Sequence, residues 1–144
     1  PEVQVVVTES VLTRELAVLP DDVIRLRHFP IGEYRAAFDA SVMAAGYNSF
    51  QEAMALGLPT LFIPNQSTAK DDQDARTLWA EQSGYGLRWD DSGGDVSDAG
   101  LHESVDKLVD PVEQARMRDR MAELPPATGA QEIAAALDDW SRRA

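Results

Sequence analysis

The sequence predicts an α/β domain of the Rossmann-like type, in which helices flank a mostly parallel sheet. Short apolar segments alternate with segments whose apolar residues recur at helical spacing, and this alternation is typical of βα units. The chain has 144 residues, enough for one domain with a buried core and too few for two. We therefore expect residues 1–144 to form a single domain.

Five short segments are predicted to be strands, because apolar and β-branched residues dominate them. They are Val3–Val7, Val23–Arg27, Ser41–Ala44, Thr60–Ile63 and Tyr85–Arg88. In open parallel sheets, ligands bind beyond the carboxyl ends of the strands. The loops that follow these segments are therefore the expected place for a site.

Helices are predicted where apolar residues recur every three or four positions. The segments are Ser10–Leu19, Ile31–Phe38, Ser49–Leu56, a helix through Ala75, Leu78 and Trp79, two helices between Leu101 and Leu124, and a terminal helix through Ile133, Leu137 and Trp140. Gly57 and Pro59 mark the end of the third helix, because glycine favours the position just after a helix and proline cannot continue one.

Composition excludes several classes of function. Thirteen Lys and Arg against 25 Asp and Glu give a formal net charge of −12, whereas nucleic acids and anionic membranes require a basic surface. The absence of cysteine excludes disulfides, cysteine-based zinc sites and thiol nucleophiles. No apolar run approaches the roughly 18–20 residues of a membrane span, and no signal peptide is evident. We expect a cytoplasmic protein whose partner is neither nucleic acid nor a membrane.

The first candidate site follows the predicted strand Ser41–Ala44. A turn at Gly46 precedes a helix that is predicted to begin near Asn48 or Ser49. The N–H groups of a helix's first turn, together with the helix dipole, attract a diphosphate, and glycine lets it approach the backbone closely. Glu52 lies one turn into the helix, where its carboxylate can accept hydrogen bonds from both hydroxyls of a ribose. Ser49 and Glu52 also fit a capping box, and spacing alone favours that role.

A second polar segment brings Asp72 and Gln73 to the start of a later helix. A carboxylate beside an amide suits the recognition of sugar hydroxyls. The helix dipole alone, however, also accounts for Asp71, Asp72 and Asp74. Asp72 and Asp74 form a D-x-D sequence, but residues two apart on a helix point in different directions, so we expect no shared metal ion.

Three motifs, in this order along the chain, resemble a known family. They are Gly46–Glu52, the G-L-P-x-L-F-I-P run of Gly57–Pro64, and Asp72-Gln73 with Arg76. Together they resemble the donor-binding half of GT-B glycosyltransferases, and most closely glycosyltransferase family 28. The resemblance covers nearly the whole chain.

The resemblance implies a nucleoside-diphosphate sugar as the substrate, usually a uridine diphosphate (UDP) sugar, and no cofactor or metal. It assigns the diphosphate to Gly46, Asn48 and Ser49, and the ribose hydroxyls to Glu52. For Glu52 the resemblance outweighs the capping interpretation, although one residue can serve both roles.

The resemblance also assigns roles to residues outside this segment. Asp72 and Gln73 would contact the donor sugar, and Phe29 and Pro30 lie in the loop that flanks the base in relatives. Arg76 stands where some relatives have asparagine, and it would pair either with the diphosphate or with Asp72.

The implied function is that of the C-terminal domain of a metal-independent, inverting transferase. The helix N–H groups would stabilise the departing nucleoside diphosphate, and the general base that deprotonates the acceptor would come from the N-terminal domain of the same protein. The fragment alone would then be inactive, and its acceptor is unknown. Two alternatives stay open: a UDP-sugar 2-epimerase-type domain, and a non-catalytic module that binds a nucleotide or a partner chain.

The family's sheet has a central first strand, and no segment of this chain matches it or its Gly-rich loop. Val3–Val7 would then be the second strand. We expect either that Val3–Val7 pairs directly with Ser41–Ala44, or that a strand from another copy fills the gap and makes a homo-oligomer. A continuous sheet within one chain would contradict this assignment.

Overall fold

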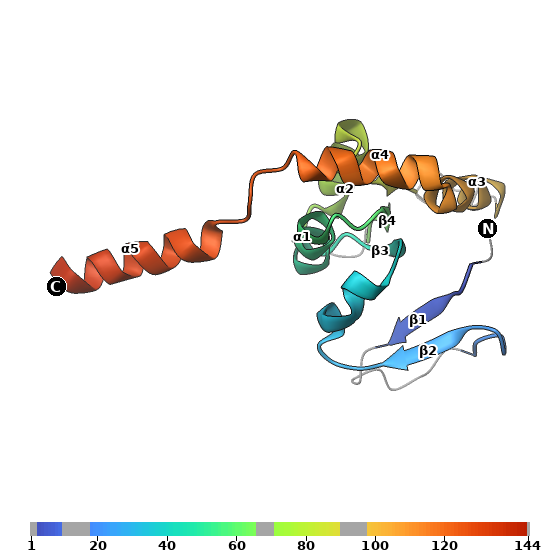
Figure 1. Cartoon of the computed structure of the whole chain (residues 1–144), viewed down its shortest axis with the longest axis horizontal. Coiled ribbons are helices and arrows are strands. Elements are labelled where there is room, and N and C mark those ends of the chain that lie inside the picture. Colours follow the sequence, from blue (N-terminus) through green and yellow to red (C-terminus); the bar gives the residue numbers. More distant parts are fainter. Residues whose placement is uncertain (1–2, 10–17, 66–70, 90–97, 144) are drawn as a thin grey trace.

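The computed structural model describes residues 3–9, 18–65, 71–89 and 98–143. It shows an α/β domain with parallel strands flanked by helices (Figure 1), which confirms the predicted fold class. The elements are β1 (Val6–Glu9), β2 (Ile24–Arg27), the 3-10 helix η1 (Ile31–Ala37), β3 (Ser41–Ala44), α1 (Tyr47–Leu56), β4 (Thr60–Ile63), α2 (Gln73–Ser83), β5 (Leu87–Arg88), α3 (Asp98–Val109), α4 (Pro111–Ala122) and α5 (Gly129–Arg143).

The predicted elements agree best with the structure in the middle of the chain. Ser41–Ala44 and Thr60–Ile63 are strands with the predicted bounds. The first strand begins at Val6, three residues later than predicted. The last strand begins at Leu87, two residues later than predicted, and ends at Arg88 as predicted. Most of the predicted helix Ser10–Leu19 lies outside the described residues.

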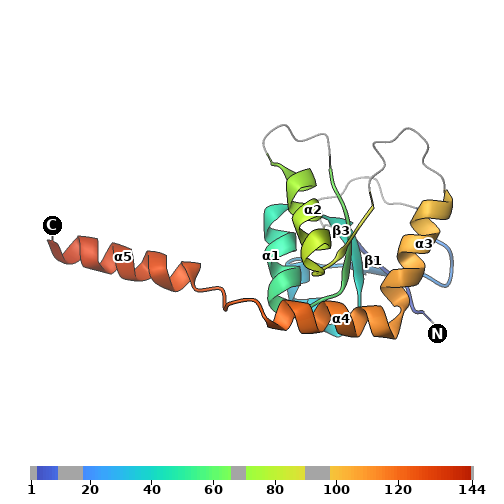
Figure 2. The same ribbon diagram turned by 90° about the horizontal axis from the view of Figure 1, so that it is seen from above.

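The strands form two separate parallel sheets. In the first, β1 pairs with β2, so that Val6 lies opposite Ile24. In the second, β4 lies between β3 and β5, and Ser41 is opposite Thr60. Figure 2 shows α1 and α2 on one side of the second sheet, α3 on the other, and α4 running across them.

The core surrounds β4 and is formed by apolar side chains of the second sheet and its helices. Its buried members are Ala45, Phe50, Ala53, Met54, Leu61, Phe62, Ala80, Leu108, Met117 and Met121. A strand that is covered on both faces reads as a continuous apolar run, which explains why Thr60–Ile63 was predicted correctly.

A cavity of about 610 Å³ separates the two sheets. Residues Val3–Thr8 line one side of it and Ser41–Met43 the other. Among the described residues no strand pairing joins β1 to β3, so the expected direct pairing of Val3–Val7 with Ser41–Ala44 is wrong. The physical reason is that this cavity keeps the backbone of β1 beyond hydrogen-bonding reach of β3, while β1 is paired with β2. The other expectation, a strand supplied by another copy, stays a prediction.

Helix α5 extends away from the rest of the domain (Figure 1). Its predicted apolar face is exposed: Ile133, Leu137 and Trp140 retain 64%, 59% and 71% of their accessible surface. The helix itself was predicted correctly, whereas a partner for its apolar face is not seen among the described residues. No described helix combines the length and the apolar character that crossing a membrane requires.

Close packing against β4 makes Gly86 a sensitive position. A Cβ atom at Gly86 would lie 2.9 Å from the ring of Phe62 and 2.9 Å from the carbonyl oxygen of Thr60. We predict that Gly86→Ala destabilises the fold by about 1–3 kcal/mol, because overpacking forces the core to shift. Urea denaturation measures this change. Gly129→Ala is the matched control, since no atom lies within 4 Å of that Cβ position. Equal stability of the two variants would contradict the prediction.

Candidate functional site

The candidate site begins where β3 leads into α1. Gly46 is the N-cap residue of α1, and the helix starts at Tyr47, one or two residues earlier than predicted. Gly46 has no side chain with which to cap the first turn. A Cβ atom on Gly46 would meet no atom of the described residues within 4 Å. The part of the chain that the structure describes therefore leaves space beside N–H groups that the helix itself cannot satisfy.

The capping-box interpretation of Ser49 and Glu52 is wrong. Because Gly46 is the N-cap residue, Ser49 lies within the first turn and Glu52 lies one turn further along. Neither residue is therefore in a position to cap the helix. Ser49 and Glu52 instead share a partner outside the helix, Arg35 of η1.

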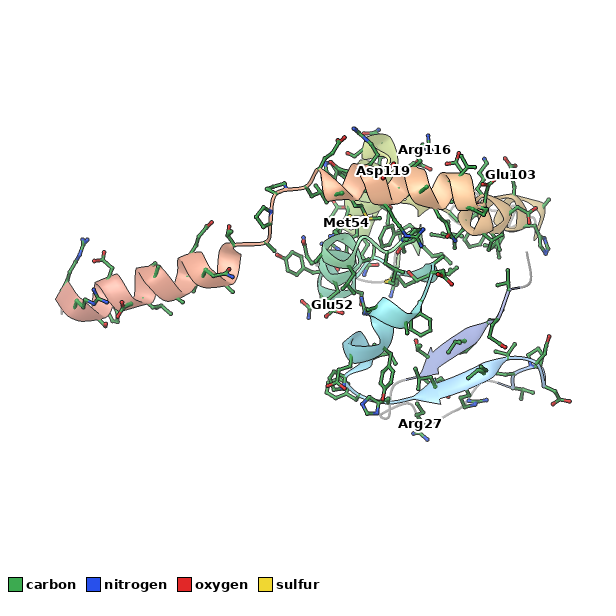
Figure 3. The ribbon with its side chains drawn as sticks, viewed as in Figure 1. Arg27, Glu52, Met54, Glu103, Arg116 and Asp119 are labelled. Atoms are coloured by element: carbon green, nitrogen blue, oxygen red, sulfur yellow. The ribbon has the colours of Figure 1, made fainter. Side chains whose placement is uncertain are left out.

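Arg35 reaches α1 through all three nitrogens of its guanidinium group. Nε lies 3.0 Å from Oε2 of Glu52. One terminal nitrogen donates to the Ser49 carbonyl oxygen at 3.0 Å, and the other donates to the Ser49 hydroxyl at 3.1 Å. The side chain of Arg35 is 11% exposed and that of Glu52 is 49% exposed, so the carboxylate remains accessible to a ligand. Figure 3 shows Glu52 on the side of α1 nearest to η1.

The predicted base-flanking residues lie between β2 and η1. Phe29 and Pro30 are joined by a cis peptide bond, and the Phe29 ring is 74% exposed. Pro30 is the residue that precedes η1. The loop is thus connected to the start of α1 through the 3-10 helix that carries Arg35.

Asp72 and Gln73 lie at the start of α2, as the sequence predicts. Asp72 is the N-cap residue, and its carboxylate accepts a hydrogen bond from the Ala75 N–H at 2.9 Å. Gln73 is buried; its oxygen accepts from the Asn65 N–H at 3.0 Å, and its nitrogen donates to Asp71 at 3.3 Å. Gln73 therefore joins Asn65, which follows β4, to the start of α2.

Arg76 joins the start of α2 to the start of α1. Its guanidinium donates to the Ala45 carbonyl oxygen and forms a 2.6 Å ion pair with Asp71. It also lies 5.7 Å from the centre of the Tyr47 ring and 5.8 Å from that of Phe50, which are cation–π distances. Of the two partners expected for Arg76, Asp72 is replaced in the structure by its neighbour Asp71.

The hydrogen bond from Arg76 lowers the pKa of Asp71 below its usual value of 3.8, and this effect outweighs the opposing effect of desolvation. Asp71 is therefore ionised at neutral pH. The sequence assigned Asp71 only to the helix dipole and gave no role to Arg35. Neither contact is signalled by local spacing, because each depends on how the chain folds.

The two carboxylates of the D-x-D sequence have different partners. Asp72 caps α2, whereas Asp74 forms a 2.5 Å ion pair with Arg88. Among the residues that the structure describes, no group of three or more His, Asp or Glu side chains is placed to hold a metal ion.

Comparison with known families identifies the domain. The glycosyltransferase family 28 C-terminal domain matches this chain over residues 11–136. The chain belongs to this family. Among curated relatives, it is 31% identical over 110 residues to the UDP-N-acetylglucosamine--N-acetylmuramyl-(pentapeptide) pyrophosphoryl-undecaprenol N-acetylglucosamine transferase of Thermotoga petrophila. The corresponding enzyme of Thermotoga maritima is 30% identical over 110 residues. Each match covers 76% of this chain and 32% of the relative, so the chain spans about a third of the length of these relatives.

Solved structures of glycosyltransferases share the fold of this family 28 domain. The spinosyn forosaminyltransferase SpnP has a TM-score of 0.67 and 19% identity, over 95% of this chain and 34% of that one. The glycosyltransferase VinC, solved in complex with DTDP, has a TM-score of 0.63 and 20% identity, over 88% of this chain and 31% of that one. These similarities confirm the predicted GT-B C-terminal fold.

Proposed function

We propose that this domain binds the nucleoside diphosphate of a nucleotide-sugar donor, and that the donor is a UDP-sugar. The observation that carries the proposal is the start of α1 at the carboxyl end of β3, where Gly46 supplies no capping side chain and the described residues leave space beside it. Family membership supports the same assignment, and the names of the curated relatives specify UDP-N-acetylglucosamine. The structure of VinC with DTDP makes thymidine nucleotides the natural comparison in a test.

In this proposal the diphosphate lies at the first turn of α1, near Gly46, Asn48 and Ser49. The N–H groups and the helix dipole would supply the positive potential locally, although the chain carries a net charge of −12. When the sugar is transferred, negative charge grows on the leaving nucleoside diphosphate. Fixed N–H groups aimed at that charge stabilise the transition state, so the proposed reaction needs no metal ion.

Glu52 would bind the ribose hydroxyls, and the loop of Phe29 and Pro30 would flank the base. The Glu52 carboxylate is half exposed and lies one turn beyond the proposed diphosphate position. Phe29 is exposed and offers an apolar surface for the base. It follows His28, whose ring meets that of Tyr34 edge to face at 5.0 Å.

The donor sugar would contact the start of α2. Asp72 is exposed there and uses one carboxylate oxygen to cap the helix, which leaves the second oxygen for a sugar hydroxyl. Gln73 is engaged with Asn65 and Asp71, so its contact with the sugar requires these hydrogen bonds to rearrange. Arg76 would hold the starts of α1 and α2 together.

The rest of the reaction would depend on sequence beyond this domain. The acceptor and the general base that deprotonates it would be bound and supplied by an N-terminal domain of the same protein, which leaves this domain inactive alone. The proposal keeps the cytoplasmic location expected from the sequence and adds a bacterial origin, which the Thermotoga relatives support. In the full-length protein, release of UDP with sugar transfer supports the proposal, whereas a changed sugar configuration indicates an epimerase and binding without turnover indicates a non-catalytic module.

We predict that UDP and UDP-sugars raise the melting temperature of the domain. A ligand that binds only the folded state adds about 2.7 kcal/mol of stability at 100 times its Kd, which corresponds to a rise of several degrees. Thermal denaturation with UDP, UDP-N-acetylglucosamine, thymidine diphosphate and guanosine diphosphate measures the preference. If no nucleotide changes the melting temperature, the proposed function is wrong.

We predict that Glu52→Gln weakens UDP binding by about 1–3 kcal/mol, the scale of a hydrogen bond to a charged group. Glu113→Gln is the matched control, because Glu113 is also paired with an arginine, at 2.7 Å, but lies on α4. Calorimetric titration should show a loss of affinity for the first variant only. A Glu52→Gln protein with a lower melting temperature and unchanged UDP affinity would contradict the ribose-binding role.

A further inference from the structure

We propose that Arg35 and Gly32 are positioning residues that fix the Glu52 carboxylate in one orientation, so that Oε1 faces the ribose. The inference rests on the proposed function, because the orientation of Glu52 matters for binding only if Glu52 contacts the nucleotide. It assigns to the 3-10 helix η1 a role in selecting ligands that carry ribose hydroxyls.

The first observation is the rigid contact between Arg35 and α1. Its Nε lies 3.0 Å from Oε2 of Glu52, while its two terminal nitrogens donate to the carbonyl oxygen and hydroxyl of Ser49. A guanidinium is planar, and its N–H groups point in fixed directions. Three contacts to one helix therefore fix the position of Nε, and with it the position of Oε2.

The second observation is independent and concerns the space that Gly32 leaves beside the same carboxylate. A Cβ atom on Gly32 would lie 3.3 Å from Oε2, 3.8 Å from Cδ and 3.9 Å from Oε1 of Glu52. A side chain at this position would be in tight contact with Oε2 and would press on the carboxylate. Glycine at residue 32 thus leaves the space in which Glu52 is held beside Arg35.

These two contacts would order the Glu52 side chain before the nucleotide binds. Arg35 engages Oε2, which directs the remaining accepting capacity of the carboxylate to Oε1. A glutamate without such restraint loses side-chain conformational entropy when it binds, and prior ordering removes that cost. Arg35 and Gly32 lie in the element that follows the Phe29–Pro30 loop, so one short segment would link the base side of the site to its ribose side.

The test compares UDP with 2′,3′-dideoxyuridine diphosphate, which keeps the base and the diphosphate but lacks both ribose hydroxyls. Calorimetric titration of the 144-residue protein gives both affinities. We expect Arg35→Gln to weaken UDP binding about tenfold, the lower end of the effect of a hydrogen bond to a charged group, and to change binding of the dideoxy analogue less than about twofold. A role confined to folding would lower both affinities equally.

Two further variants separate orientation from charge. Arg35→Lys keeps the positive charge, but one ammonium group cannot reach Oε2 of Glu52 and both oxygens of Ser49 together. We therefore expect the Arg35→Lys variant to lose most of the preference for UDP over the dideoxy analogue. Gly32→Ala leaves Arg35 in place and displaces the Glu52 carboxylate. We expect it to reduce the preference for UDP over the dideoxy analogue, but by less than the Arg35 variants do. Gly32→Ala also keeps the proposal testable if the Arg35 variants do not fold.

Arg116→Gln is the matched control. It removes one positive charge, as Arg35→Gln does, but from an arginine–glutamate pair on α4. The affinities for UDP and for the dideoxy analogue should both stay unchanged. The double variant Arg35→Gln with Glu52→Gln should bind UDP no more weakly than Glu52→Gln alone, because Arg35 acts through Glu52.

The outcomes distinguish this inference from the function on which it rests. If Glu52→Gln reduces the preference for UDP and neither the Arg35 nor the Gly32 variants do, the positioning role is wrong and the proposed function stands. If the parent protein does not bind UDP, or if Glu52→Gln leaves the preference intact, the proposed function fails and the positioning role fails with it.

Discussion

The site depends on the N–H groups at the start of α1, which no residue of that helix can satisfy. Their location is fixed by the packing behind them. β3 pairs with the buried strand β4, and Phe50, Ala53 and Met54 bury one face of α1 in the core. A helix that is anchored along its length keeps its first turn at the carboxyl edge of the sheet, which is where parallel α/β domains bind ligands.

Two arginines attach neighbouring elements to this helix. Arg35 holds η1 against Ser49 and Glu52, and Arg76 holds the start of α2 against the carbonyl of Ala45. Both arginine side chains are largely buried, at 11% and 19% exposure, and each is paired with a carboxylate. Because each arginine is paired with a carboxylate, the positive potential proposed for the diphosphate position comes from the N–H groups and the dipole of α1.

The sequence was sufficient for features set by local patterns and insufficient for contacts between distant segments. Ser41–Ala44 and Thr60–Ile63 were predicted correctly, because buried strands between turn residues have a strong local signal. The start of α1 was misplaced because Ser49-x-x-Glu52 imitates a capping box, whereas Gly46, without a capping side chain, ends the strand and begins the helix. The pairs Arg35–Glu52 and Arg76–Asp71 were missed because side-chain partners depend on tertiary packing. No segment of the sequence matches the family's central strand, which predicted direct pairing of β1 with β3; in the structure these two strands lie on opposite sides of a cavity instead.

The central claim is that a nucleoside diphosphate binds at the first turn of α1. The most direct measurement is a titration of the ¹⁵N-labelled domain with UDP, followed by NMR of the backbone amides. The account predicts the largest chemical-shift changes at Gly46, Tyr47, Asn48 and Ser49, because their N–H groups would exchange hydrogen bonds to water for hydrogen bonds to phosphate oxygens. Saturable binding with unchanged amide signals at these four residues, and shifts confined to other elements such as α4, would contradict it.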